Sequence, residues 1–146
     1  MEHFGFWQRW LFIAGLIIII FGLLMAFLNQ TRPFDLLFNN QINPIFWGVR
    51  AVPEEVVVFQ SWIYGVLGAT VAGWGVFLAF IAHYPFKNKE RWAWNCVALG
   101  MLLWFTVDTA ISLYFGVIFN ALFNTILLIA VLLPLILSRR AFSNNP

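Results

Sequence analysis

The feature that most constrains this chain is an uninterrupted apolar run, Leu11 to Leu28, close to its first residue. The run is 18 residues long, whereas the apolar region of a secretory signal peptide has about 7–15 residues and precedes a small-residue cleavage site. Here the run ends in Met25-Ala26-Phe27-Leu28-Asn29, which is no such site. We therefore expect an uncleaved membrane-spanning helix over residues 10–28.

Three further stretches are long and apolar enough to cross a bilayer. The second covers residues 60–84 and ends before Pro85. Trp92 to Ser138 is 47 residues, about twice one span, so a turn near Gly116 should separate spans at 91–114 and 117–138. The chain is 62% hydrophobic and 10% charged, whereas soluble domains carry about 25% charged residues. The prediction is an all-α polytopic membrane protein, with residues 1–146 forming one domain of four transmembrane helices in an antiparallel bundle.

The connection between the first and second spans is long and unusual in composition. Its prolines and Gly48 are expected to interrupt any continuous helix, yet the segment is rich in Phe, Leu, Ile and Trp. These two facts predict a segment that lies in the membrane interface and folds over the end of the bundle, where it would also cover the apolar turn near Gly116. Pro53-Glu54-Glu55 is typical of a helix start, which predicts that the second helix begins ahead of the membrane.

The basic residues predict the orientation in the membrane. With four spans, Arg32 and Arg50 fall on one side, and the other six basic residues fall opposite: Arg9, Lys87, Lys89, Arg91, Arg139 and Arg140. Basic residues favour the cytoplasmic side, so both termini should be cytoplasmic and the long loop extracytoplasmic. The layout is similar in outline to that of many small four-helix bacterial membrane proteins, so we expect a bacterial plasma (inner) membrane location.

Asp108 is the leading candidate for a functional residue. An ionisable group inside a span is costly and normally faces the protein interior with a partner. Ser112 and Trp104 lie one helical turn away on either side, Asn120 and Asn124 share a face of the fourth span, and Tyr64 enters from the second. We expect an outer-half pocket with mostly apolar walls and a few convergent polar groups, a typical small-molecule site. Its candidate ligand-binding residues are Asp108, Ser112, Asn120, Asn124, Tyr64 and Trp104.

A purely structural interpretation of Asp108 is also open. The carboxylate would then pair with Arg32 or Arg50 from the overlying loop, or accept hydrogen bonds from Trp104 and the asparagines. Trp74 and Trp104 both fall at mid-membrane depth, where core packing is the expected role and stacking on a flat apolar ligand is the alternative.

Small residues recur every fourth position in the second span, at Gly65, Ala69 and Gly73. This spacing lets helix backbones approach closely inside lipid. Packing within the same bundle is the favoured interpretation, and homodimerisation is the alternative.

Several kinds of chemistry have no support in the sequence. There is neither an H-E-x-x-H zinc motif nor a phosphate-binding G-x-x-x-x-G-K-[ST] loop, and Cys96 is the single cysteine. His83 lies at the end of a span, so we expect no metal site and no cofactor. No histidine base accompanies a serine on the outer side, and a lone carboxylate does not favour an enzyme. A net charge of +2 gives no indication of nucleic-acid binding.

Two functional hypotheses remain. The favoured one is a non-enzymatic membrane protein that self-associates or serves as an accessory subunit of a larger membrane complex. The alternative is binding or transport of a small apolar ligand in the outer-half pocket anchored by Asp108. An ion pathway is disfavoured because the inner half offers only Asn95 and His83 as polar groups.

Overall fold

The computed structural model describes residues 4–143, which are helical throughout apart from short turns and contain no strand. Four helices in this range are long and apolar enough to cross a membrane, as predicted. They are α1 (Phe4–Phe27), α4 (Glu54–His83), α5 (Arg91–Tyr114) and α6 (Ile118–Ser138). The second begins directly after Pro53, as the sequence indicated, so it starts six residues before the expected 60–84 span and ends one residue before it.

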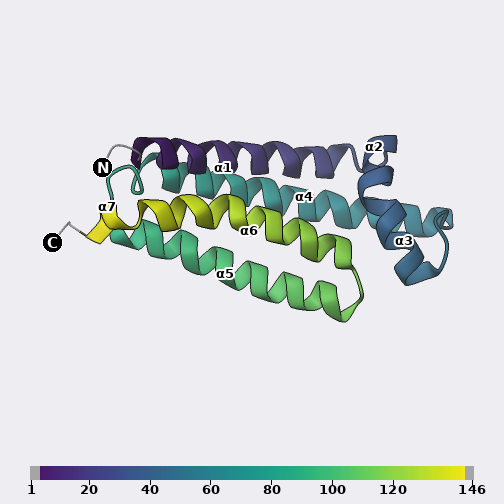
Figure 1. Cartoon of the computed structure of the whole chain (residues 1–146). Helices are drawn as coiled ribbons and strands as arrows, with labels where there is room; N and C mark the ends of the chain where they lie inside the picture. The colour runs from purple at the N-terminus through teal and green to yellow at the C-terminus, as the bar shows by residue number, and fades with distance from the viewer. Residues whose placement is uncertain (1–3, 144–146) are drawn as a thin grey trace.

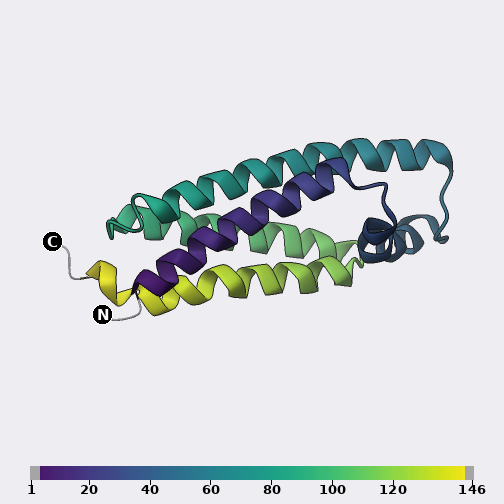
Figure 2. The same cartoon turned by 90° about the horizontal axis from the view of Figure 1, so that it is seen from above.

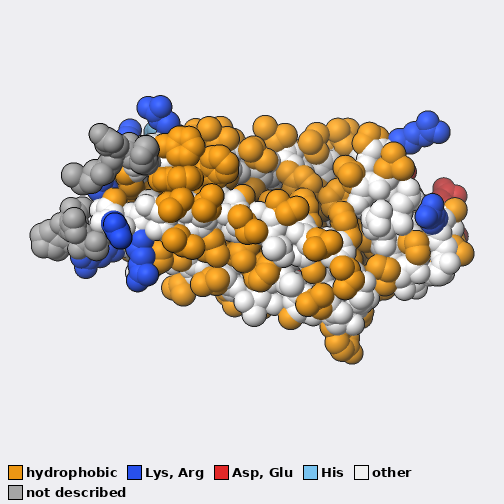
Figure 3. All heavy atoms as spheres, viewed as in Figure 1, with side chains coloured by type: hydrophobic (Ala, Val, Ile, Leu, Met, Phe, Trp, Pro, Cys, Tyr) orange, Lys and Arg blue, Asp and Glu red, His pale blue; other side chains and the backbone are white. Residues whose placement is uncertain are grey.

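The four long helices run side by side, and each runs opposite to the one before it in the chain (Figure 1). Helix α1 packs along the length of α4 and also contacts α6, which in turn packs along α5. Hydrophobic side chains cover the middle of the face in Figure 3, whereas Lys and Arg gather at the end that carries the termini. Outward-facing residues such as Phe77 and Leu103, each 68% exposed, are apolar, as a lipid-facing surface requires.

Glycines set the close approach of α1 and α4. A Cβ atom at Gly15 would lie 2.7 Å from the backbone nitrogen of Ala79, and one at Gly75 would lie 2.6 Å from that of Ile19. Gly68 is equally crowded by the α1 backbone. Without side chains at these points the two backbones touch, which is how small residues bring helices together in lipid.

The connection between α1 and α4 differs from the prediction that its prolines and glycine interrupt any continuous helix. It is helical from residue 32 to residue 47, through α2 (Arg32–Phe34), the π-helical turn η1 (Asp35–Asn39) and α3 (Asn40–Trp47). Pro44 lies inside α3, and the helix ends only at Gly48, which adopts a left-handed φ of 69°. A proline removes one backbone donor, and here that loss is outweighed by burial of Phe34 and Phe38 against the long helices.

The connection covers the turn between α5 and α6. That turn lies at Gly116, where φ is 75°, close to where the sequence indicated it. The ring of Phe38 lies 5.5 Å from that of Phe119, and the ring of Phe46 lies 5.9 Å from that of Phe115. These contacts bring together the two apolar segments that were expected to cover one another.

The helices are packed more tightly at the end that carries the termini than at the opposite end. The larger buried cluster lies at the terminal end, around Leu11, Ala82, Phe86 and Leu135, each of which has no exposed surface. The short helix α7 (Arg140–Ser143) adds Phe142 to it. A smaller cluster of Met25, Phe34, Phe38 and Tyr64 lies beneath the connection. A cavity between the long helices is bordered by both clusters.

Candidate functional site: a cavity between the membrane helices

A cavity of about 500 Å³ lies between the four long helices and the connection, towards the end that the connection covers. Its walls are mostly aliphatic and aromatic, and they come from α1, η1, α3, α4, α5 and α6. The structure brings all six candidate ligand-binding residues to this one cavity: Tyr64, Trp104, Asp108, Ser112, Asn120 and Asn124.

Asp108 is the centre of a hydrogen-bonded cluster that joins α5 to α6. Its Oδ1 atom accepts hydrogen bonds from Nδ2 of Asn120 at 2.7 Å and Nδ2 of Asn124 at 2.9 Å. The Ser112 hydroxyl lies 3.2 Å from the same oxygen and donates to the Asp108 backbone carbonyl at 2.8 Å. Asn124 is 2% exposed and also donates to the Thr109 hydroxyl at 3.3 Å.

The donors on Oδ1 come from neutral side chains. Within residues 4–143 no arginine or lysine forms an ion pair with Asp108. The alternative in which Arg32 or Arg50 pairs with the carboxylate is therefore not observed among these residues. Trp104 does not donate to it either, whereas the asparagines do, as the structural interpretation expected. The Oδ2 atom accepts no hydrogen bond from any described residue, although Asp108 lines the cavity. The cluster therefore leaves one carboxylate oxygen available to a donor in the cavity.

Two tryptophans form part of the cavity wall below the polar cluster. The rings of Trp74 on α4 and Trp104 on α5 lie 5.6 Å apart and are tilted by 49°. Neither indole N–H donates a hydrogen bond within the described range, in contrast to Trp10 and Trp94, which donate to backbone carbonyls of α6. Both tryptophan side chains thus belong to the cavity lining.

The repeat Gly65-Ala69-Gly73 does not make the close contact between α1 and α4. That contact uses Gly68 and Gly75, which lie on a different line along α4. A Cβ atom at Gly73 would meet no described heavy atom within 4 Å, and Ala69 is exposed. The repeat therefore forms a strip of small residues that is open at Ala69 and Gly73, whereas a Cβ atom at Gly65 would lie 3.9 Å from the Ala26 carbonyl oxygen of α1.

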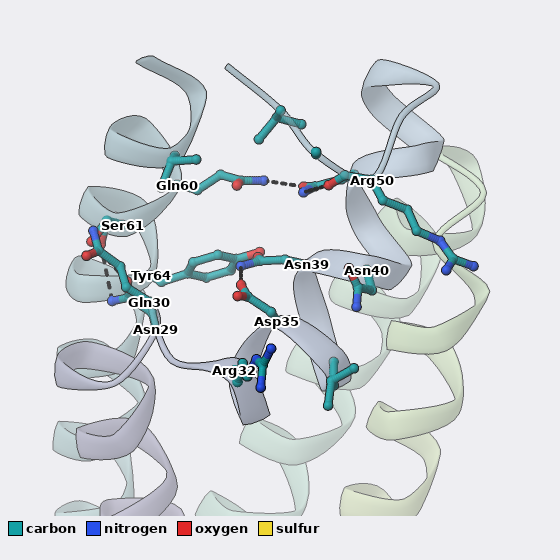
Figure 4. Close-up of a pocket in the computed structure, with 15 residues that line it drawn as sticks. Asn29, Gln30, Arg32, Asp35, Asn39, Asn40, Arg50, Gln60, Ser61 and Tyr64 are labelled. Carbon is teal, nitrogen blue, oxygen red and sulfur yellow. Dashed lines mark hydrogen bonds between the residues drawn. The ribbon is translucent and has the colours of Figure 1, made fainter. Parts of the chain in front are cut away.

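A second cavity, of about 790 Å³, lies between the connection and the first turns of α4 (Figure 4). Its lining is polar: Asp35, Asn39 and Asn43 come from the connection, and Gln60 and Ser61 from α4. Tyr64 lines both cavities. The residues from the connection are not among the candidates that the sequence indicated, although their spacing of four places them on one face once the segment is helical.

Amide side chains cross-link the walls of this second cavity. Gln60 Nε2 donates to Asn43 Oδ1 at 2.7 Å, and Asn43 Nδ2 donates to the Arg50 carbonyl at 2.9 Å. Asn39 Nδ2 donates to Asp35 Oδ1 at 2.7 Å, and Ser61 donates to Asn29 Oδ1 at 2.9 Å. These bonds attach the connection to α4 and give the cavity a defined shape.

Neither cavity offers a metal site of the usual kind, because residues 4–143 contain no group of three His, Cys, Asp or Glu side chains able to hold an ion. Comparisons with family models, with curated proteins and with solved structures found no match to this chain.

Proposed function

We propose that this protein binds a small, mainly apolar molecule that carries one hydrogen-bond donor, in the cavity between its membrane helices. The observation that carries the proposal is the position of Asp108: its Oδ1 is held by neighbouring side chains, whereas Oδ2 has no partner among residues 4–143 in a mostly apolar cavity. A donor on the ligand would complete the carboxylate with a charge-assisted hydrogen bond. The apolar body of the ligand would pack against Trp74 and Trp104.

The dimensions of the cavity support a small ligand. Ligand pockets usually measure about 300–1,000 Å³, and this cavity measures about 500 Å³. The apolar walls suit a molecule that reaches the site from the bilayer. The packing at the terminal end supports binding in preference to passage through the protein, because Leu11 and Leu135 are fully buried there.

Asp108→Asn tests the proposal with little change in shape. Asparagine keeps an oxygen in the Oδ1 position for the donors from α6, and it replaces the unpaired Oδ2 with an NH₂ group that repels a ligand donor. We expect the variant to fold normally and to bind naphthylamine, an apolar ring with one amine, about tenfold or more weakly, which corresponds to the loss of one hydrogen bond to a charged group. Fluorescence titration of the protein in detergent micelles measures the affinity.

Two controls accompany this test. Methylnaphthalene has the same ring without the donor, and its binding should be unaffected by Asp108→Asn. Thr106→Val removes a polar group from an exposed position of α5 outside the cavity and should leave both affinities unchanged. Equal binding of naphthylamine by Asp108→Asn and the unmodified protein would contradict the proposal. So would a variant that is less stable but whose folded form binds naphthylamine with unchanged affinity.

We place the molecule in the bacterial inner membrane with both termini in the cytoplasm. Support comes from the positive charge, which gathers at the terminal end (Figure 3). In this orientation the connection and both cavities face the extracytoplasmic side, and residues 1–146 act as one transmembrane domain surrounded by lipid.

Self-association is a second candidate function, favoured by the open strip of Gly65, Ala69 and Gly73. No described heavy atom lies within 4 Å of a Cβ built at Gly73, so a second copy of α4 could approach there as closely as α1 approaches Gly68 and Gly75. Gly73→Ile should then shift the protein from dimer to monomer in detergent, measured by light scattering during size-exclusion chromatography. Gly100→Ile, at an equally open glycine of α5, is the matched control. If the unmodified protein is already monomeric, self-association is contradicted. Association as an accessory subunit of a larger complex would then be tested by co-purification.

A further inference from the structure

We propose that the second cavity binds a zwitterion that joins a primary ammonium to a phosphate, as in the headgroup of an aminophospholipid. This site shares Tyr64 with the Asp108 cavity but has its own carboxylate and amides, so the inference does not depend on the function proposed above. It follows from which polar atoms around the cavity have partners and which do not.

The orientation of each amide in the cavity is fixed by a group that can only accept. The Arg50 backbone carbonyl requires a donor, so Asn43 presents Nδ2 to it and Oδ1 to Gln60, which must then donate through Nε2. The Asp35 carboxylate also requires a donor, so Asn39 presents Nδ2 to it. Turning either chain of amides around would set two oxygens against each other.

The same constraint leaves three acceptor atoms of the lining without a partner among the described residues. Asn39 Oδ1 is buried and has no hydrogen-bond partner. Gln60 Oε1 and Asp35 Oδ2 likewise accept no hydrogen bond from any residue between 4 and 143. Figure 4 shows Asn39 and Tyr64 pointing toward one another across the cavity, with Asp35 directly beside Asn39. A buried polar atom without a partner calls for an explanation, and a donor in this cavity supplies one.

A primary ammonium matches these acceptors best. It carries three N–H donors and a positive charge, which suits several oxygens around one carboxylate, Asp35. Arg32 and Arg50 add positive charge to the lining, and guanidinium groups are suited to phosphate. Next to this polar lining Leu36 is 65% exposed and its neighbour Leu37 is 59% exposed, so acyl chains would have an apolar surface to contact. A zwitterionic lipid headgroup at the end of the bundle fits all three features.

The test uses the full-length protein in detergent micelles with three lipids of matched chains. Phosphatidylethanolamine offers a primary ammonium, phosphatidylcholine replaces its N–H donors with methyl groups, and phosphatidylglycerol has no cation. Native mass spectrometry of retained lipid should show phosphatidylethanolamine preferred over both others by about tenfold. Equal retention of phosphatidylethanolamine and phosphatidylcholine by the unmodified protein would overturn the proposal.

Variants then assign the preference to this cavity. Asp35→Asn keeps an acceptor for Asn39 and removes the charge, so the preference for phosphatidylethanolamine should disappear while thermal unfolding stays the same. Arg32→Gln should weaken phosphatidylethanolamine and phosphatidylcholine alike, because both carry the phosphate. Gln41→Leu, at an exposed position of α3 outside the cavity, should change nothing, and Asp108→Asn should also leave the preference intact. A preference that survives Asp35→Asn would overturn the assignment to this cavity.

A competition experiment identifies the source of the zwitterion. Soluble phosphoethanolamine carries the same ammonium and phosphate without acyl chains. If the lipid is the ligand, phosphoethanolamine should displace it only at concentrations far above those of the lipid. Displacement at equal concentration would support the zwitterion as the recognised group and would overturn the lipid as its source.

Discussion

Asp108 shows how a carboxylate can be held inside a membrane protein without a cationic partner among the described residues. Two amides and one hydroxyl surround Oδ1, and they come from α5 itself and from α6. Each hydrogen bond to a charged group contributes about 1.5–3 kcal/mol, so the bonds from the two amides offset part of the cost of removing the carboxylate from water. Oδ1 of the carboxylate therefore has a structural role, whereas Oδ2 is left for a donor in the cavity.

Asn124→Leu should destabilise the protein, because Asn124 is buried and its amide donates to both Asp108 and Thr109. The free energy of unfolding should fall by about 1–3 kcal/mol, the usual effect of leaving a buried polar group with fewer partners. Thermal unfolding in detergent, followed by circular dichroism, measures the change. Asn95→Leu, at an exposed asparagine of α5, is the control and should shift the midpoint little. Equal shifts for the two variants would show that the cluster does not stabilise the fold.

The sequence predicted which residues line this cavity more completely than it predicted which side chains donate hydrogen bonds to Asp108. Helical spacing alone places Ser112 and Trp104 beside Asp108, and Asn120 beside Asn124, so their arrival at one cavity follows from the period of the helix. Which donor reaches the carboxylate depends on how α5 and α6 are rotated against each other. A single sequence does not encode that rotation in any local pattern, and for this reason the loop arginines remained a plausible alternative.

At the scale of the elements, the contact between α1 and α4 holds the first half of the chain together. Both helices present glycine where their backbones meet. The sequence contains several lines of small residues along α4, and the one with strict four-residue spacing, Gly65-Ala69-Gly73, is not the line that α1 uses. The choice among these lines depends on the side chains of α1, which a pattern within α4 cannot reveal.

Gly75→Leu should separate α1 from α4. A leucine side chain would begin 2.6 Å from the Ile19 backbone, and backbone atoms cannot move aside as a flexible side chain can. Overpacking of this kind costs about 1–3 kcal/mol, and the cost should be at the upper end here. Gly100→Leu introduces the same side chain at an open position of α5 and should leave the unfolding midpoint unchanged or raised. Similar midpoints for both variants would contradict the packing of α1 on α4.

The connection illustrates where local rules fail. Proline and glycine predicted an interrupted segment, and only Gly48 ends a helix as expected. The chain stays helical through Pro44 because one face of the segment buries Phe34 and Phe38, and the other pairs Asn43 with Gln60. Tertiary contacts of this kind outweigh one missing backbone hydrogen bond. The polar cavity was missed for the same reason, since it exists only when the connection is a helix.

At the scale of the whole molecule, the two ends differ in both charge and packing. The terminal end carries most of the lysines and arginines and a well-packed core, whereas the opposite end carries the Asp108 cavity and the polar cavity beside the connection. This asymmetry fits the orientation proposed above, in which the terminal end is cytoplasmic and the proposed ligand sites lie at the opposite end.

Cysteine labelling tests this orientation. In a Cys96→Ser background, Gln41→Cys in α3 and Asn88→Cys in the turn after α4 place single thiols at opposite ends of the molecule. A membrane-impermeant maleimide should label Gln41→Cys in intact bacterial cells, and it should label Asn88→Cys only after permeabilisation. The reverse pattern would place the termini outside and would contradict the proposed orientation.

The most direct measurement of the central claim is a structure of the protein with naphthylamine bound. The account predicts the ring between Trp74 and Trp104 and the amine within about 3 Å of Asp108 Oδ2, the usual length of a charge-assisted hydrogen bond. Naphthylamine found only on the lipid-facing surface, with the cavity closed by side chains, would contradict it.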